Sequence, residues 1–128
     1  MTASRQRLGR HAEAIVAREL ERRGWRIVER NARPVDVRGE LDIVALDGRE
    51  LVIVEVKAGR LGAVRGPVSP LEMVGARKRA RLRALAAAWA RQHRGELPRL
   101  SGLRIDVVGL RLDAAGRVAE WRHLRAAC

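Results

Sequence analysis

The stretch that decides the fold runs from residue 39 to residue 57 and reads GELDIVALDGRELVIVEVK. Within it, two runs of aliphatic and β-branched residues, 41–46 and 51–56, flank the pair Asp47-Gly48. An Asp-Gly pair between two such runs is a strong indicator of a β-hairpin with a tight turn. We therefore predict two antiparallel strands in this stretch.

Three charged side chains of this hairpin share one face of the predicted sheet. Side chains alternate along a strand, so Glu55 and Lys57 lie on the same face, and the predicted turn places Asp42 opposite Glu55. Two facing carboxylates repel each other, and a hard divalent cation such as Mg²⁺ or Mn²⁺ would offset that repulsion. A lysine beside such a cation can support the nucleophile or the developing negative charge in phosphodiester hydrolysis. The sequence therefore predicts a metal site with phosphodiesterase chemistry.

An exposed salt bridge between Lys57 and one of the two carboxylates is the alternative interpretation, and such surface pairs are common. Apart from these charges, however, the hairpin is apolar on both faces. A sheet that is apolar on both faces is covered on both faces. We therefore expect the charges at a buried edge or cleft, where ionisable groups usually have a function.

The remaining elements are predicted from hydrophobic periodicity and turn residues. They are a helix over Ser4–Arg23, a strand over Trp25–Val28, the hairpin strands Leu41–Leu46 and Leu51–Val56, a loop over Gly59–Pro70, a second helix ending near His93, and strands over Leu103–Leu112 and Val118–Leu124. The second helix is predicted to begin with Ser69 as N-cap, Pro70 at the first helical position and Glu72 completing a capping box. The order αβββαββ favours an α/β fold, a mixed β-sheet flanked by helices, in a single domain over residues 1–128.

The composition indicates a soluble globular protein. Hydrophobic residues make up 47% of the 128 residues and charged residues 33%, which is enough to bury a core without disulfides or a structural metal. Cys128 is the single cysteine, so the chain forms no internal disulfide, and we expect a cytoplasmic location. No apolar run is long enough to span a bilayer, and we expect no membrane partner.

The net charge of +12, from 27 basic and 15 acidic residues, favours a polyanionic partner, most simply nucleic acid. A GC-rich coding bias is the alternative source of this charge, because 25 of the 27 basic residues are arginine. Against that background the two lysines, Lys57 and Lys78, are informative, since a site that needs a compact ammonium group would retain lysine.

The second predicted helix carries the densest basic segment, and Arg77, Lys78 and Arg81 are its candidate nucleic-acid contacts. An ordinary solvated helix face is an equal alternative for the arginines. Lys78 falls in register with Val74 and Leu82, so its amine can point towards the charged end of the sheet, or simply extend from a packed stem to solvent. No helix offers base-reading side chains, so we expect recognition of nucleic-acid structure rather than of sequence.

A third carboxylate, Glu13, lies at the edge of the buried stripe of the first predicted helix, beside Val16 and Leu20. From that position its side chain could reach the charged end of the sheet. Taken alone, a carboxylate such as Glu13 is more often an ordinary boundary residue, and that interpretation is favoured without the other site residues.

These residues resemble a known pattern. Glu13 on the first helix, Gly39-Glu40-Leu41-Asp42, and Glu55-Val56-Lys57 are similar to the PD-(D/E)xK, or restriction-endonuclease-like, nuclease superfamily. More closely, the stretches GRHAEAIVARELERRGWRIVERNAR, GELDIVALDGRELVIVEVK and RIDVVG, with Lys78 between the last two, resemble the YraN-like family of small uncharacterised bacterial proteins.

The resemblance implies a restriction-endonuclease-like mixed sheet flanked by helices. It further implies Asp42, Glu55 and the backbone carbonyl of Val56 as ligands of Mg²⁺ or Mn²⁺, Lys57 as the catalytic lysine, and Glu13 as the helix-one carboxylate of the site. DNA is favoured over RNA as the partner. The implied activity is metal-dependent hydrolysis of phosphodiester bonds in structured or branched nucleic acid.

Two alternatives to a nuclease stay open. The chain could be a non-catalytic nucleic-acid-binding module with an endonuclease-like fold, or a protein-interaction factor whose basic charge reflects codon usage. A homodimer is compatible with action on a duplex, although no long exposed apolar stripe in the sequence specifies an interface.

Overall fold

The computed structural model describes residues 3–62 and 74–128, and these residues form one five-stranded sheet with two helices. The elements are α1 (Ala3–Arg22), β1 (Arg26–Ala32), β2 (Leu41–Asp47), β3 (Glu50–Arg60), α2 (Ala76–Gln92), β4 (Gly102–Leu112) and β5 (Val118–Leu124). The strands lie side by side in sequence order, and only the β3–β4 pair is parallel. The predicted order αβββαββ and the mixed sheet are confirmed.

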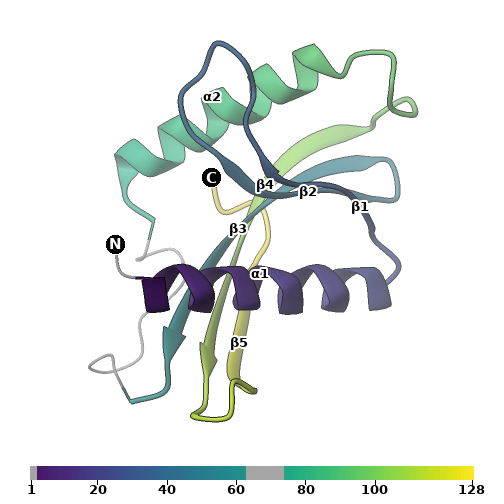
Figure 1. Cartoon of the computed structure of the whole chain (residues 1–128). Coiled ribbons are helices and arrows are strands. Elements are labelled where there is room, and N and C mark those ends of the chain that lie inside the picture. Colours follow the sequence, from purple (N-terminus) through teal and green to yellow (C-terminus); the bar gives the residue numbers. More distant parts are fainter. Residues whose placement is uncertain (1–2, 63–73) are drawn as a thin grey trace.

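The helices cover opposite faces of the sheet (Figure 1). On one face, Val16 and Leu20 of α1 pack against Ile43, Val52 and their neighbours. On the other, α2 covers the second core, which contains Val44, Leu46, Leu51, Ile53, Leu82, Leu85 and Trp89. The central strands are therefore apolar on both sides, as the hairpin sequence predicted. Among the described residues, no helix combines the length and apolar character needed to cross a bilayer.

The predicted hairpin register is confirmed. Asp47 pairs with Glu50 at the turn, and the antiparallel ladder runs back to the pair Ile43–Val54. It ends there, whereas β3 continues to Arg60 because the parallel neighbour β4 pairs with it along its whole length. The prediction of a loop from Gly59 onward is therefore wrong for its first two residues, since the hydrogen-bonding partner that extends the strand is distant in sequence.

The first strand was predicted too short. It extends to Ala32 rather than ending at Val28, with an irregularity between Ile27 and Glu29. Residues 29–31 of this strand are polar, which a half-exposed edge strand tolerates but which sequence propensity does not recognise as a strand.

The second helix begins at Ala76, with an extended Gly75 at the N-cap position and no side-chain cap. The predicted cap residues Ser69, Pro70 and Glu72 lie outside the described residues. Val74 precedes the helix, so its prediction as a helical residue is wrong. It is nevertheless buried in the α2-side core, at 2% exposure.

Candidate functional site

Asp42 and Glu55 lie one residue beyond the last paired residues of β2 and β3, Ile43 and Val54. Here a side-chain hydrogen bond replaces the backbone pairing between the two strands: the main-chain N–H of Val56 donates to Asp42 Oδ2 at 2.9 Å. The Glu55 side chain is buried on the α2 side of the sheet, at 3% exposure. The two predicted carboxylates are therefore adjacent, at the level where the two strands cease to pair.

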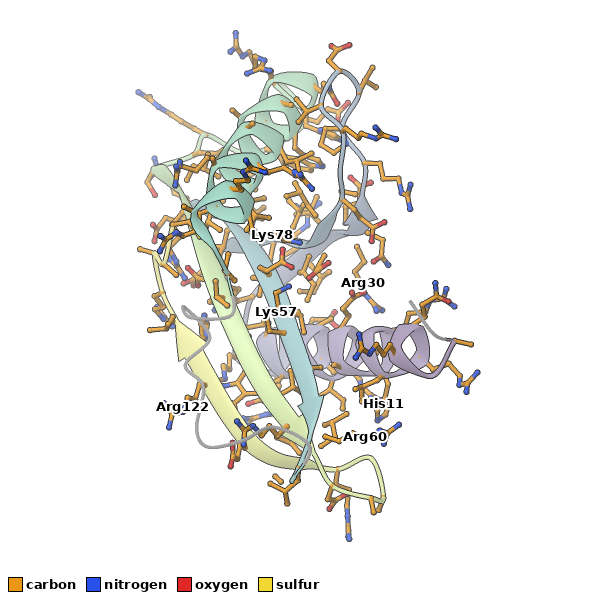
Figure 2. The ribbon with its side chains drawn as sticks, turned by 90° about the vertical axis from the view of Figure 1, so that its left-hand side faces the viewer. His11, Arg30, Lys57, Arg60, Lys78 and Arg122 are labelled. Carbon is orange, nitrogen blue, oxygen red and sulfur yellow. The ribbon has the colours of Figure 1, made fainter. Side chains whose placement is uncertain are left out.

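Two ammonium groups converge on the same carboxylate oxygen. Lys57 Nζ lies 3.8 Å from Glu55 Oε1, and Lys78 Nζ lies 3.6 Å from that atom. Figure 2 shows Lys57 on β3 and Lys78 on α2 one above the other, with Arg30 of β1 beside them. The other carboxylate oxygen, Glu55 Oε2, is buried and has no hydrogen-bond partner among the described residues. One oxygen of Glu55 thus faces two lysines, and the other is buried without a hydrogen-bond partner among the described residues.

Burial raises the pKa of Glu55 to about 7, and the neighbouring negative charge of Asp42 adds to the effect, while Lys78 and Lys57 oppose it. Burial also raises the pKa of Asp42, although the Val56 N–H and hydrogen bonding with Glu55 hold that rise back. The pKa of Glu55 thus lies near neutral pH, so this carboxyl group is partly protonated there. A bound cation would displace that proton, because it stabilises both carboxylates in their charged form.

Glu13 of α1 is linked by the side chain of Asn31 to Glu40, two residues before Asp42. With its amide oriented to satisfy its neighbours, Asn31 donates hydrogen bonds of 2.9 Å to Glu13 Oε1 and to Glu40 Oε1. Asn31 has a positive φ of 54°, a left-handed conformation that asparagine tolerates better than most residues. Burial raises the pKa of Glu13 to about 7, with a further contribution from the charge of Asp42. The predicted third carboxylate therefore lies close enough to Asp42 to respond to its charge, but it does not converge with Asp42 and Glu55 on one point among the described residues.

The donor set fits a cation that keeps part of its own hydration shell. No three His, Cys, Asp or Glu side chains converge as a ligand set within residues 3–62 and 74–128. Asp42, Glu55 and the Val56 carbonyl would hold such a cation, with water in the remaining positions. That arrangement is typical of Mg²⁺, which commonly takes only one or two carboxylates, and not of a closed zinc site. The partnerless Oε2 atom of Glu55 is the feature that fits a ligand here.

Comparison with known proteins places the chain in a family. The model of the uncharacterised protein family UPF0102 matches residues 12–110, a range that contains all the cluster residues described above. The chain belongs to family UPF0102. This is the YraN-like family that the sequence pattern resembles.

Relatives match over nearly their full length. A UPF0102 protein of Paenarthrobacter aurescens is 46% identical over 94% of this chain and 93% of its own. A UPF0102 protein of Arthrobacter sp. is 48% identical over 92% of both chains. One from Streptomyces coelicolor is 42% identical over 88% of this chain and 82% of its own. This membership is consistent with the fold and assigns no activity.

The structure separates the three predicted nucleic-acid contacts of this UPF0102 chain. Arg77 and Arg81 are exposed on α2, whereas Lys78 joins the carboxylate cluster through Glu55. The Arg81 stem also lies near Gly39: a Cβ atom added to Gly39 would meet Arg81 Cδ at 3.5 Å and Leu85 Cδ1 at 3.0 Å. Because Gly39 also has a φ of +134°, glycine fits both the backbone conformation and the close approach of α2 just before Asp42.

Sequence reasoning assigned no role to two of the residues that support the site. Asn31 donates hydrogen bonds to both Glu13 and Glu40, and Glu40 is itself paired with Arg33 at 2.9 Å. Both residues are part of the family-like stretches quoted in the sequence analysis, Asn31 in the first and Glu40 in the second. Their shared hydrogen bonds depend on α1 and β1 meeting at the start of β2, which no local pattern reveals.

A second buried charge cluster supports the sheet rather than the site. Asp106 is fully buried and accepts hydrogen bonds from Arg104 Nε at 3.0 Å, His123 Nε2 at 2.8 Å and the N–H of Ala126 at 2.9 Å. The sequence indicated no role for His123, which contacts Asp106 from β5.

Proposed function

We propose that this protein is a metal-dependent nuclease that hydrolyses phosphodiester bonds in structured or branched nucleic acid. The observation that carries the proposal is the buried Glu55 carboxylate. Its Oε1 atom faces two lysines, its Oε2 atom has no hydrogen-bond partner among the described residues, and Asp42 lies beside it. A buried carboxylate pair in which one oxygen lacks a partner is costly unless a ligand compensates for it.

The metal part of the proposal rests on Asp42, Glu55 and the Val56 carbonyl, which would hold Mg²⁺ or Mn²⁺. When bound, such a cation activates water and polarises a phosphoryl oxygen. The Val56 N–H fixes the Asp42 carboxylate, so the ligand geometry is set before any substrate arrives.

The side chains around this pair have separate roles in the proposal. Lys57, whose side chain is 28% exposed, can reach the reacting phosphate and stabilise its developing negative charge. Lys78, which is 40% exposed, supplies a second ammonium from the opposite element and contacts the phosphate. Glu13 has a pKa of about 7, so it can exchange a proton with water near neutral pH.

The charge of the chain supports a polyanionic substrate. The net charge is +12, and the exposed Arg77 and Arg81 continue from the cluster along α2. Arginine contacts to the phosphate backbone give affinity without sequence specificity, which suits recognition of branched or unpaired structures.

One observation favours a second candidate, a nucleic-acid-binding module without catalysis. Glu13 does not complete a three-carboxylate ligand set among the described residues, so the cation would depend on two carboxylates. The competing functions differ in one outcome: both bind nucleic acid with steep salt dependence, but only the nuclease cleaves it.

The test is a cleavage screen of branched, flapped and single-stranded DNA and RNA with Mg²⁺ or Mn²⁺. We expect cleavage by the wild-type protein and at least about a hundredfold loss in Glu55→Gln and Lys57→Ala, since each removes a group that acts on the transition state. The matched controls are Glu21→Gln on α1 and Arg26→Ala on β1, two exposed residues outside the cluster. Equal cleavage by Glu55→Gln, Lys57→Ala and the controls would contradict the assignment, and salt-dependent binding without cleavage would support the binding module.

A further inference from the structure

A hollow of about 590 Å³ adjoins the carboxylate cluster on the side away from α2. One wall is formed by the first turns of α1 and the other by the end of β1 and the segment that follows it. The residues that line the hollow are Arg5, Gln6, Gly9, Arg10, Glu13, Asn31, Arg33 and Glu40. Its volume lies within the range of roughly 300 to 1,000 Å³ that is typical of small-ligand sites.

Glu13 belongs both to this hollow and to the proposed nuclease site. Its carboxylate lines the hollow, and it shares the Asn31 amide with Glu40, which stands two residues before Asp42. A nucleic-acid strand with its scissile phosphate at Glu55 and Lys57 would therefore reach the hollow with the neighbouring nucleotide.

The lining has complementary chemistry for a nucleotide. Arg5, Arg10 and Arg33 bring guanidinium groups to the hollow, with Arg33 in a 2.9 Å ion pair with Glu40. Guanidinium groups match the geometry of phosphate oxygens. Glu13 and Glu40, held in place by Asn31, supply oxygen acceptors for the amino group of a base or a sugar hydroxyl. Positive charge and fixed acceptors thus meet in one small volume.

We propose that this hollow binds one unpaired nucleotide of the substrate strand, next to the cleaved phosphate. A paired base is stacked within its duplex and cannot enter such a hollow, so only an unpaired or extruded nucleotide fits. The inference deepens the proposed nuclease function, on which its ligand class rests, and assigns it a preference for unpaired ends and branch points over continuous duplex.

Gly9 provides a direct way to fill the hollow. It lies within α1, it lines the hollow, and a Cβ atom added to it meets no atom within 4 Å. The position therefore has room for a side chain, so Gly9→Leu extends one from the wall of the hollow, and Gly9→Ala is the matched control that adds only a methyl group. Both substitutions replace glycine by a better helix former, so the helix is retained.

The measurement is fluorescence anisotropy in EDTA, where cleavage cannot interfere. The probes are a fluorescein-labelled DNA duplex with one unpaired single-stranded end and the matching blunt duplex. We expect the wild type and Gly9→Ala to bind the unpaired end about tenfold more tightly than the blunt duplex, as expected for contacts to one unpaired nucleotide. We expect Gly9→Leu to lose that preference and to bind the blunt duplex as the wild type does. A preference that survives in Gly9→Leu would overturn the proposal.

A second pair of variants tests the charge of the hollow independently. Arg10→Gln removes a lining guanidinium, and Arg18→Gln removes an exposed arginine on the same helix that lies outside this hollow. We expect Arg10→Gln to weaken binding of the unpaired-end probe about tenfold. The slope of the logarithm of its binding constant against the logarithm of the salt concentration should decrease in magnitude by about one. We expect Arg18→Gln to change neither quantity. Equal effects of the two variants would refute a local phosphate contact.

These results separate the inference from the nuclease proposal. Loss of the preference in Gly9→Leu, with no cleavage by the wild type in Mg²⁺ or Mn²⁺, would support the nucleotide site and reject the nuclease. Cleavage by the wild type, with an unchanged preference for the unpaired end in Gly9→Leu, would support the nuclease and reject the nucleotide site.

Discussion

Asp42 Oδ2 accepts a hydrogen bond from the main-chain N–H of Val56, 2.9 Å away, at the level where β2 and β3 stop pairing. The carboxylate thus satisfies a backbone donor that the ladder no longer satisfies, and it is held in a fixed position beside Glu55. One residue supports the strand and also presents a candidate ligand, so its two roles must be separated by the choice of substitution.

Asp42→Asn separates them, because the amide oxygen can still accept the Val56 hydrogen bond but is a weaker cation ligand. We expect Mn²⁺ to raise the thermal midpoint of the wild type. At a free Mn²⁺ concentration of a hundred times the Kd, the free energy of unfolding should increase by about 2.7 kcal/mol. We expect no such rise in Asp42→Asn, whose stability without metal stays near that of the wild type. The measurement is differential scanning fluorimetry with and without Mn²⁺, and an equal rise in both proteins would exclude Asp42 as a ligand.

The raised pKa of Glu13 predicts a pH-dependent stability. Its folded pKa of about 7 exceeds the ordinary value of 4.5, so the folded state favours the protonated form. The stabilisation from this proton is present below pH 4.5 and is lost as pH rises through about 7. Glu13→Gln keeps a neutral side chain, so we expect it to exceed the wild type in stability above pH 7. The full shift corresponds to roughly 3 kcal/mol, and solvent screening at this half-buried position reduces the expected difference to about 1 kcal/mol, which disappears towards pH 4.5.

Urea denaturation across this pH range measures the effect, and Glu19→Gln on the same helix is the control. Hydrogen bonds from Arg22 and Arg23 lower the pKa of Glu19 to about 2, so its contribution has the opposite sign and is lost as pH falls. A Glu13→Gln curve parallel to that of the wild type would show that Glu13 is not perturbed.

Lys78 and Lys57 contact the same oxygen of Glu55 from different elements, and their substitution should have different kinetic effects. We expect Lys57→Ala to lower kcat, since Lys57 acts on the reacting phosphate. We expect Lys78→Ala mainly to raise KM, by about tenfold, because it removes a phosphate contact. Steady-state kinetics on the best substrate of the cleavage screen provide the measurement, with Lys78→Arg as the charge-preserving control. A loss confined to kcat in Lys78→Ala would place Lys78 in the chemical step.

Asp106 is predicted to be structural. It is fully buried and bonded to Arg104, His123 and the Ala126 N–H, so Asp106→Ala leaves these donors unsatisfied in the interior. We expect a loss of about 3–5 kcal/mol in the free energy of unfolding, measured by urea denaturation. The comparison is Glu120→Ala, which breaks a 3.4 Å ion pair with Arg111 at a half-exposed position and should cost less than about 1 kcal/mol. Similar losses in the two variants would show that the Asp106 cluster adds nothing beyond a surface pair.

Local patterns predicted the elements that have strong local determinants. Strand β5 has the predicted bounds, Val118–Leu124, and α1 differs from its prediction by one residue at each end. The hairpin register followed from the Asp47-Gly48 turn, because a tight turn determines which residues face each other. Elements that depend on distant partners were placed less well: β1 is an edge strand whose residues 29–31 are polar, and the end of β3 is set by its pairing with β4.

The sequence by itself determined that Asp42, Glu55 and Lys57 share one face of a hairpin, because side-chain alternation and a single turn fix their positions within one short stretch. Only the tertiary structure decided what surrounds them. Packing of α2 brings Lys78 to 3.6 Å from Glu55, and packing of α1 against β1 lets the Asn31 amide bind both Glu13 and Glu40. Burial between these elements then raises the pKa of both glutamates to about 7. Such effects depend on excluding water with segments far apart in the chain, and no local sequence pattern encodes them.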